Sequence, residues 1–217
     1  MAEFTFDFGR RERIGLAEAV LCQGKTTSQI SNALALARAQ DVPLLLTRLA
    51  AEAFEALEPA ERIEIDYDPL SRTGLFGRID DPLTKGTVAV VTGGTSDLAV
   101  AREAVRTLAF YGVDAHEIAD VGVAGLWRIL QHEDELKAYP VVIVAAGMEG
   151  ALFSVIGGLV GGLVIAVPTS NGYGVARDGE TALSAALASC SPGLVAVNID
   201  NGYGAACAAL RVLHRIK

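Results

Sequence analysis

The chain has 217 residues, of which 51% are hydrophobic and 20% are charged, and its formal net charge is -8 at pH 7. This composition is typical of a globular protein and argues against intrinsic disorder. The acidic balance argues against a nucleic-acid partner, which would require a basic surface. Because Lys and Arg are scarce, we expect backbone N–H groups, helix N-termini or a metal ion to hold any anionic substrate.

The first 70 residues mix short helical and strand patterns. Helices are predicted over 12–21, 27–40 and 50–57, and strands over 42–46 and 63–67. Thr26 and Gln29 have the spacing of a capping box, which favours a helix that starts at Thr27. Glycines, a proline and several charges over 71–86 are typical of a linker. The sequence therefore predicts a small α+β region over 1–70, a linker over 71–86 and a second domain over 87–217.

From residue 87 onward, apolar runs alternate regularly with helical patterns. Strands are predicted over 87–92, 113–118, 140–146, 163–167 and 194–199, and helices over 97–111, 123–137, 150–162, 180–190 and 204–215. Repeated βα units of this spacing form a parallel sheet that helices cover on both faces. The predicted fold class is therefore α/β with three layers. We interpret the apolar segment 150–168 as a buried helix and strand, and we expect no membrane span.

Ligands of parallel α/β sheets bind beyond the carboxyl ends of the strands, which selects the loops 92–97, 119–123, 147–150 and 198–204. In the first of these loops, Gly93 and Gly94 permit close backbone approach, and Ser96 can cap the following helix. We interpret this loop as a phosphate or ribose site. The alternative is a capped βα turn in which Asp97 only complements the helix dipole.

Two other Gly-rich segments resemble nucleotide-binding motifs without matching them. The segment GKT at 24–26 lacks the first glycine of a P-loop, because Ala19 stands in its place, and a predicted helix precedes it. The pattern that begins at Gly202 and Gly204 lacks the third glycine of a dinucleotide fingerprint, and no βα unit follows it. Neither motif is therefore adopted.

The three cysteines, Cys22, Cys190 and Cys207, lie far apart without a CxxC pair, which argues against disulfides and zinc. We place Cys207 within the first turn or so of the last helix, where the helix dipole and free N–H groups favour a thiolate. A buried core thiol is the alternative for this residue. We interpret Cys22 and Cys190 as core residues. The histidines lie outside the four loops, which argues against a His triad or a His-ligated metal.

Five segments, taken in order, resemble the LarB family, which builds the nickel-pincer nucleotide cofactor and is related to the PurE-type aminoimidazole ribonucleotide carboxylases. They are TGGTSD at 92–97, ADVGVAG at 119–125, AAGMEGAL at 145–152, AVPTSNGYG at 166–174 and VNIDNGYGAACAAL at 197–210. The resemblance covers about 86–215, and residues before it match more loosely. It implies a flavodoxin-like, PurE-type fold and a homo-octamer.

The charged first residues, MAEFTFDFGRRER, lack the apolar core of a signal peptide, so we expect a cytoplasmic protein.

The chain departs from the PurE relatives where their chemistry resides. They carry Ser in place of Gly94, His in place of Val121 and Ala151, and Asn in place of Cys207. Proton-handling histidines are thus absent and a nucleophile is present, which disfavours imidazole carboxylation and matches LarB.

Within LarB, the resemblance would place His at Trp127 and Pro at Phe153, so local geometry or specificity differs there. The resemblance implies that nicotinic acid adenine dinucleotide, the co-substrate CO₂ and water become pyridinium-3,5-biscarboxylate mononucleotide and AMP. Cys207 would be the nucleophile, and Glu149 would be the base, with Asp97 or Asp120 as its rival. Mg²⁺ is expected for phosphoanhydride hydrolysis.

The remaining substrate-binding residues are expected in the same four loops. They are Gly93, Gly94, Thr95, Ser96, Asp120, Gly122, Val123, Gly147, Met148, Gly150, Asn198, Asp200 and Asn201. Two other functions stay open, a PurE-type aminoimidazole ribonucleotide carboxylase or mutase and a non-catalytic nucleotide-binding module. A mean hydropathy of +0.37 indicates apolar surface that is buried in a homo-oligomer.

Overall fold

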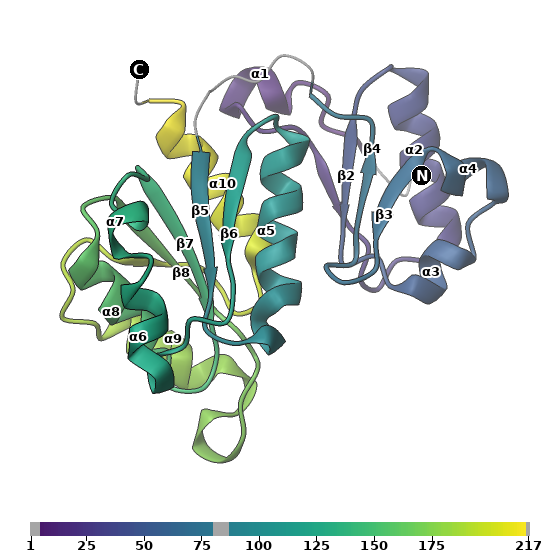
Figure 1. Ribbon diagram of the computed structural model, residues 1–217. Helices are drawn as coiled ribbons and strands as arrows, with labels where there is room; N and C mark the ends of the chain where they lie inside the picture. Colours follow the sequence, from purple (N-terminus) through teal and green to yellow (C-terminus); the bar gives the residue numbers. More distant parts are fainter. Residues whose placement is uncertain (1–4, 80–86, 216–217) are drawn as a thin grey trace. The chain divides into compact units, whose positions relative to one another are not determined.

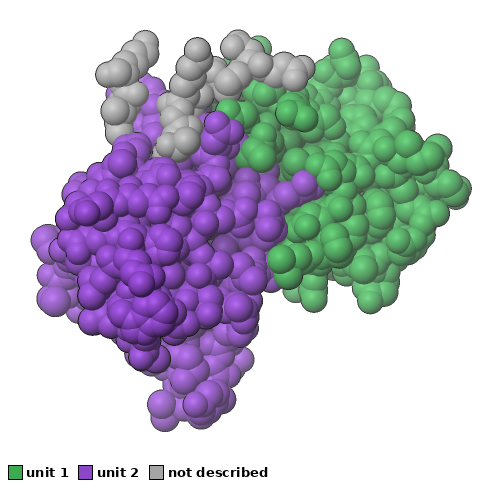
Figure 2. Space-filling model, in the orientation of Figure 1, with its two compact units in different colours: residues 1–83, 109–112 green, residues 84–108, 113–217 purple. Residues whose placement is uncertain are grey.

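The computed structural model describes residues 5–79 and 87–215. Contacts divide the chain into two compact units, residues 1–83 with 109–112 and residues 84–108 with 113–217 (Figure 2). Each unit has a sheet and a hydrophobic core of its own. The boundary between 83 and 84 falls within the segment expected as a linker, of which residues 80–86 lie outside the described residues.

The N-terminal unit is a small α+β structure with a mixed sheet. Its elements are α1 (Arg10–Ile14), β1 (Ala19–Leu21), α2 (Thr27–Ala39), β2 (Leu44–Thr47), α3 (Ala51–Glu55), α4 (Pro59–Ile63), β3 (Ile65–Asp68) and β4 (Thr73–Phe76). The strand order is β1-β2-β4-β3, in which β1 and β2 are parallel and the other pairs are antiparallel.

Helix α2 begins where the capping box predicts. The Thr26 hydroxyl accepts a hydrogen bond from Gln29 N (3.3 Å), and the Gln29 side chain accepts one from Thr26 N (3.0 Å). The predicted apolar face of the helix, Ile30, Ala33, Leu34 and Ala37, is buried with residues of the strands in the core of this unit.

Two predictions for this unit are wrong. The predicted helix over 12–21 ends early, because Gly15 adopts a left-handed conformation (φ 77°) and Ala19–Leu21 pairs with β2 instead. The predicted linker contains β4, which lies between β2 and β3, so the N-terminal sheet extends past residue 70. Both errors arise because strand pairing is a tertiary contact that local composition does not encode.

The C-terminal unit is a doubly wound α/β structure, as predicted. Its elements are β5 (Thr87–Thr92), η1 (Thr95–Asp97), α5 (Leu98–Phe110), β6 (Asp114–Ile118), η2 (Val123–Gly125), α6 (Leu126–Leu130), α7 (Glu133–Leu136), β7 (Val141–Ala146), α8 (Ala151–Leu159), β8 (Leu163–Pro168), η3 (Gly174–Gly179), α9 (Glu180–Leu187), β9 (Val195–Ala196) and α10 (Gly202–Leu213). All neighbours in the strand order β6-β5-β7-β8-β9 are parallel. This is the flavodoxin-like order, in which the direction of winding reverses between β5 and β7.

Helices cover both faces of this sheet, so the three-layer prediction is confirmed. Side chains of α6, α7, α8 and α9 are buried in one core with Val91, Val144 and Ala166 of the strands. Helix α10 contacts β7 and β8, and Figure 1 shows it with α5 on the opposite side of the sheet. The predicted helix over 123–137 is broken into η2, α6 and α7. Within the described residues, no helix has both the length and the apolar character that crossing a bilayer requires.

Candidate functional site

A cavity of about 570 Å³ opens at the carboxyl edge of the parallel sheet. Its walls come from the loops after β5, β6, β7 and β8. These loops include those that follow β5 and β7, the two strands between which the winding direction reverses. Ligands of flavodoxin-like sheets bind at this point, so the cavity is the candidate site.

Most of the residues predicted to form the site line the cavity. They are Gly93, Gly94, Ser96, Asp97, Gly122, Val123, Gly147, Met148, Glu149 and Gly150. The predicted residues Thr95, Asp120, Asn198, Asp200, Asn201 and Cys207 do not line it. Its other lining residues, which were not among the predicted catalytic or substrate-binding residues, are Ala124, Arg128, Ala146, Ala151, Leu152, Asn171, Gly172 and Tyr173.

The missed residues differ in the signal that could have found them. Asn171 and Tyr173 follow β8 directly, so the rule that ligands bind at the carboxyl ends of strands would have included their loop. Arg128 lies on α6, beyond the loop after β6, and its position at the cavity depends on how the short helices pack. No local pattern indicates it.

Asp97 is a buried residue whose side chain connects two of the cavity loops through hydrogen bonds. Its side chain accepts hydrogen bonds from Gly94 N (2.9 Å), Thr169 Oγ1 (2.6 Å) and Asn171 Nδ2 (3.0 Å). The residue is only 5% exposed. Because both carboxyl oxygens already accept hydrogen bonds from the protein, Asp97 orders the loops after β5 and β8, and it is less suited to proton transfer than a carboxylate without partners.

The loop after β7 is fixed against the loop after β8 through backbone contacts. Met148 N donates a hydrogen bond to Asn171 O (2.8 Å). Gly147 permits this approach, because a Cβ atom at that position would lie 2.1 Å from the same oxygen. The Asn171 side chain also donates to Ser96 O (2.8 Å), so Asn171 connects three walls of the cavity.

Four non-glycine residues in the connections after strands of this sheet have a left-handed backbone. They are Asp120 (φ 58°), Met148 (φ 51°), Asp178 (φ 57°) and Asp200 (φ 54°). Such conformations are unfavourable for residues with a side chain, and they concentrate at functional sites where the surroundings enforce them. Their position at the carboxyl edge of the sheet agrees with the location of the cavity.

The loop before α10 has a structural role beside the cavity. Asp200 Oδ1 accepts a hydrogen bond from Ser170 N (2.8 Å), which joins this loop to the one that contains Asn171. Asn201 Oδ1 accepts from Gly204 N (2.8 Å) and caps α10. The cap explains why α10 starts at Gly202, two residues before the predicted start.

Because of this earlier start, Cys207 lies in the second turn of α10, further from the helix start than predicted. The N–H group of Tyr203, in the first turn, donates to the buried carboxylate of Glu103 (3.1 Å). Cys207 is 9% exposed. The free N–H groups of the helix start therefore favour its thiolate less than expected.

The other two cysteines differ from each other. Cys22 is buried, as predicted, and its burial raises the pKa of the thiol to about 12. Cys190 is exposed, which contradicts its interpretation as a core residue. The reason is that α9 ends at Leu187, so Cys190 lies in the turn beyond the helix instead of on its buried face.

The titratable groups that line the cavity are the carboxyl groups of Asp97 and Glu149, the guanidinium of Arg128 and the phenol of Tyr173. Glu149 is exposed and forms no hydrogen bond or ion pair with the described residues. Arg128 forms an ion pair with Asp120 (Nη1 to Oδ2, 3.1 Å). The histidines lie elsewhere, as predicted, and His116 and His132 both pair with Glu135. Glu149 is therefore the carboxyl group of the cavity that is available for proton transfer.

Comparison with known proteins identifies both halves of the chain. Residues 1–78 match the family described as the LarB/PurE-like N-terminal domain, and residues 87–216 match the family described as AIR carboxylase. An uncharacterized protein of Methanocaldococcus jannaschii is 37% identical over 221 residues, which cover 96% of this chain and 84% of that protein. The chain belongs to the LarB/PurE-like AIR carboxylase superfamily.

The fold of this LarB/PurE-like protein is also that of solved PurE structures. A PurE2 variant from Treponema denticola has a TM-score of 0.52 and 19% sequence identity, over 62% of this chain and 82% of that chain. Treponema denticola PurE has a TM-score of 0.51 and 19% identity, over 60% and 82%. These similarities establish the flavodoxin-like, PurE-type fold, and membership of the superfamily establishes an AIR carboxylase-like enzyme.

Proposed function

We propose that this protein carboxylates the pyridinium ring of nicotinic acid adenine dinucleotide with CO₂ and hydrolyses the phosphoanhydride. The products are pyridinium-3,5-biscarboxylate mononucleotide and AMP. The observation that supports this proposal most is a cavity without histidine in a chain whose first part matches the LarB/PurE-like N-terminal domain. PurE-type relatives have histidines at Val121 and Ala151, so their proton chemistry is not available here.

The ring chemistry requires a nucleophile, because a pyridinium offers no electron-rich carbon to CO₂. The Cys207 thiolate adds to ring position 4, and the electron pair moves to the ring nitrogen to give a neutral dihydropyridine. Position 5 is then the nucleophilic carbon of an enamine, and it forms the new C–C bond to CO₂. Glu149 removes the proton from that carbon, and expulsion of the thiolate restores the aromatic ring.

Two helix starts at the cavity suit the phosphate groups. The first N–H groups of η1 and of α8 have no partner inside their own helices, and Ser96, Ala151 and Leu152 line the cavity. These groups would hold the phosphoanhydride while water attacks one phosphorus atom and the other phosphate leaves. The Gly94 N–H group is excluded from this role, because it donates to Asp97.

Among the residues that the structure describes, no group of three or more His, Cys, Asp or Glu side chains is placed to hold a metal ion. Mg²⁺ remains a proposal, as an ion that arrives with the phosphates of the substrate and offsets their charge.

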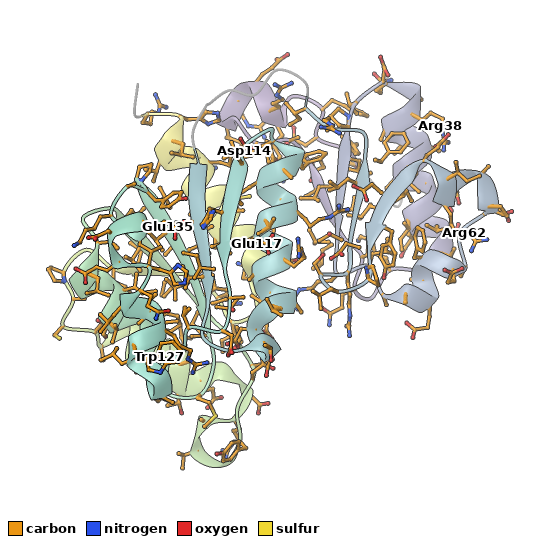
Figure 3. The ribbon with its side chains drawn as sticks, in the orientation of Figure 1. Arg38, Arg62, Asp114, Glu117, Trp127 and Glu135 are labelled. Carbon is orange, nitrogen blue, oxygen red and sulfur yellow. The ribbon has the colours of Figure 1, made fainter. Side chains whose placement is uncertain are left out.

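The proposed adduct requires that Cys207 and the cavity meet in the assembled protein, since Cys207 does not line the cavity of one chain. We propose a homo-oligomer, an octamer by resemblance to the PurE-type carboxylases. Large apolar side chains on the surface support association, among them Val175 (92% exposed), Tyr173 (76%) and Trp127 (63%), the last on α6 (Figure 3). A monomer at micromolar concentration by light scattering would contradict this assembly.

The test is a mass-spectrometric assay with nicotinic acid adenine dinucleotide and ¹³C-bicarbonate. We expect a pyridine mononucleotide that carries one labelled carboxyl group, together with AMP. Cys207→Ser should lower turnover by several orders of magnitude and retain substrate binding, because a serine hydroxyl is a weaker nucleophile and a poorer leaving group. Cys190→Ser is the matched control and should keep wild-type turnover. Near-wild-type turnover of Cys207→Ser would refute the adduct.

A mixing experiment decides whether the two groups act across chains. Oligomers refolded from a mixture of inactive Cys207→Ser and inactive Glu149→Gln chains regain activity only if one site takes these residues from different copies. A mixture that stays inactive places both residues of a site in the same chain.

Two alternatives remain as outcomes of the same assay. The AIR carboxylase match favours a PurE-type carboxylase or mutase, which would convert an aminoimidazole ribonucleotide and leave the dinucleotide unchanged. A non-catalytic nucleotide-binding module would return unaltered dinucleotide from a tight complex.

A further inference from the structure

Arg128 brings a fixed positive charge to the cavity. Among the described residues that line the cavity, it is the only Lys or Arg. Its guanidinium is held in place on one side, where Nη1 lies 3.1 Å from Asp120 Oδ2 and Nη2 donates to Gly122 O (3.4 Å). An arginine that is anchored in this way loses little side-chain entropy when it binds a further partner.

The loop after β6 is shaped to receive this guanidinium. A Cβ atom at Gly125 would lie 2.7 Å from Arg128 Nε, so a side chain at this position would push the guanidinium away from its present place. The two anchoring contacts use part of the five N–H donors of the group. The side chain is 30% exposed, which leaves the remaining donors accessible to a ligand.

The other charged side chains that line the cavity are the carboxyl groups of Asp97 and Glu149, which repel anions. The phosphate groups of a nucleotide already have the helix starts of η1 and α8. Arg128 therefore remains for a second anionic group of the ligand. A planar guanidinium matches a planar carboxylate through two parallel hydrogen bonds.

We propose that Arg128 determines the specificity of the cavity by binding the ring carboxylate of a pyridine-3-carboxylate ligand. This inference rests on the proposed function for the identity of the dinucleotide. The corresponding amide carries no charge and presents an NH₂ donor to the guanidinium donors, so it pairs with Arg128 less well. The residue thus selects the acid over the amide.

The test measures equilibrium binding by calorimetry without CO₂, for nicotinic acid adenine dinucleotide and nicotinamide adenine dinucleotide. Wild-type protein should prefer the acid. Arg128→Gln should weaken binding of the acid on the order of 10- to 100-fold, because a charge-assisted hydrogen bond is lost. The same substitution should change binding of the amide by less than about 3-fold. Arg128→Lys should give an intermediate loss, because lysine keeps the charge without the planar fork. The amide affinity of each variant also reports whether it is folded.

Arg102→Gln is the matched control. Arg102 also forms a partly exposed ion pair in the same unit, to Glu117 (3.0 Å), and it does not line the cavity. Arg102→Gln should leave the affinities for both dinucleotides unchanged.

Equal losses of affinity for the acid and the amide in Arg128→Gln would overturn the proposal and assign Arg128 to a phosphate. Unchanged affinities in Arg128→Gln would overturn the proposal as well.

The outcome is separable from that of the proposed function. Failure to form the biscarboxylate product, together with an acid preference that depends on Arg128, would refute the reaction and support the specificity role. Formation of the biscarboxylate product, together with a preference for the acid that Arg128→Gln leaves intact, would support the reaction and refute the specificity role of Arg128. A wild-type protein that binds neither dinucleotide would overturn both.

Discussion

Replacing Asp97 by asparagine tests whether the buried carboxyl group orders the cavity loops. The carboxyl group accepts from Gly94 N, Thr169 Oγ1 and Asn171 Nδ2, at 2.6 to 3.0 Å. An asparagine of the same shape has one oxygen and one NH₂ group, so in either orientation the NH₂ group faces a donor. At least one hydrogen bond to a charged group is lost, which costs about 2 kcal/mol in the free energy of unfolding.

Differential scanning calorimetry measures this effect and can resolve the transitions of the two units. For a chain of this size, about 2 kcal/mol corresponds to a melting temperature lower by roughly 4–8 °C. Dinucleotide affinity should fall as well, because Asn171 connects three walls of the cavity. Asp134→Asn is the control, since the Asp134 side chain is fully exposed and its ion pair to Lys137 contributes little. A melting temperature of Asp97→Asn within about 1 °C of this control would refute the reasoning.

Three further outcomes are expected. In the native protein, iodoacetamide should label the exposed Cys190 first and leave Cys22 unlabelled up to pH 9, because burial raises the pKa of Cys22 to about 12. Rapid labelling of Cys22, detected by peptide mass spectrometry, would contradict its burial. Glu149→Gln should lower turnover and keep dinucleotide affinity within a few-fold, whereas lost binding with unchanged turnover would make Glu149 a substrate ligand. Burial, and to a lesser extent the charge of Arg215, lower the pKa of His214 in the folded protein below its ordinary 6.5. As the pH falls, the His214 imidazole is therefore protonated in the unfolded chain before it is protonated in the folded one, and the free energy of unfolding decreases below about pH 6.5. Urea unfolding of His214→Gln should show a weaker dependence on pH in that range than the wild type.

The architecture of the C-terminal unit could be predicted from the sequence because strands buried on both faces leave a direct signal. Val141–Ala146 and Leu163–Pro168 are nearly continuous apolar runs, and each is followed by a loop and a helical pattern. Their order along the chain, combined with right-handed crossovers, restricts the topology to few choices. The carboxyl-edge rule then places Gly93, Gly147 and Glu149 at one site, where the cavity lies.

The tertiary structure alone decided the features that depend on contacts between distant residues. Arg128 reaches the cavity through the packing of α6. Asn171 is held at the cavity by hydrogen bonds to Asp97 and Ser96, which lie 74 and 75 residues away in the sequence. The start of α10, which moves Cys207 into the second turn, depends on the Asn201 cap. Strand β4 exists because it pairs with β2 on one side and with β3 on the other. Local sequence fixes propensity and periodicity, whereas these contacts form only when the chain is folded.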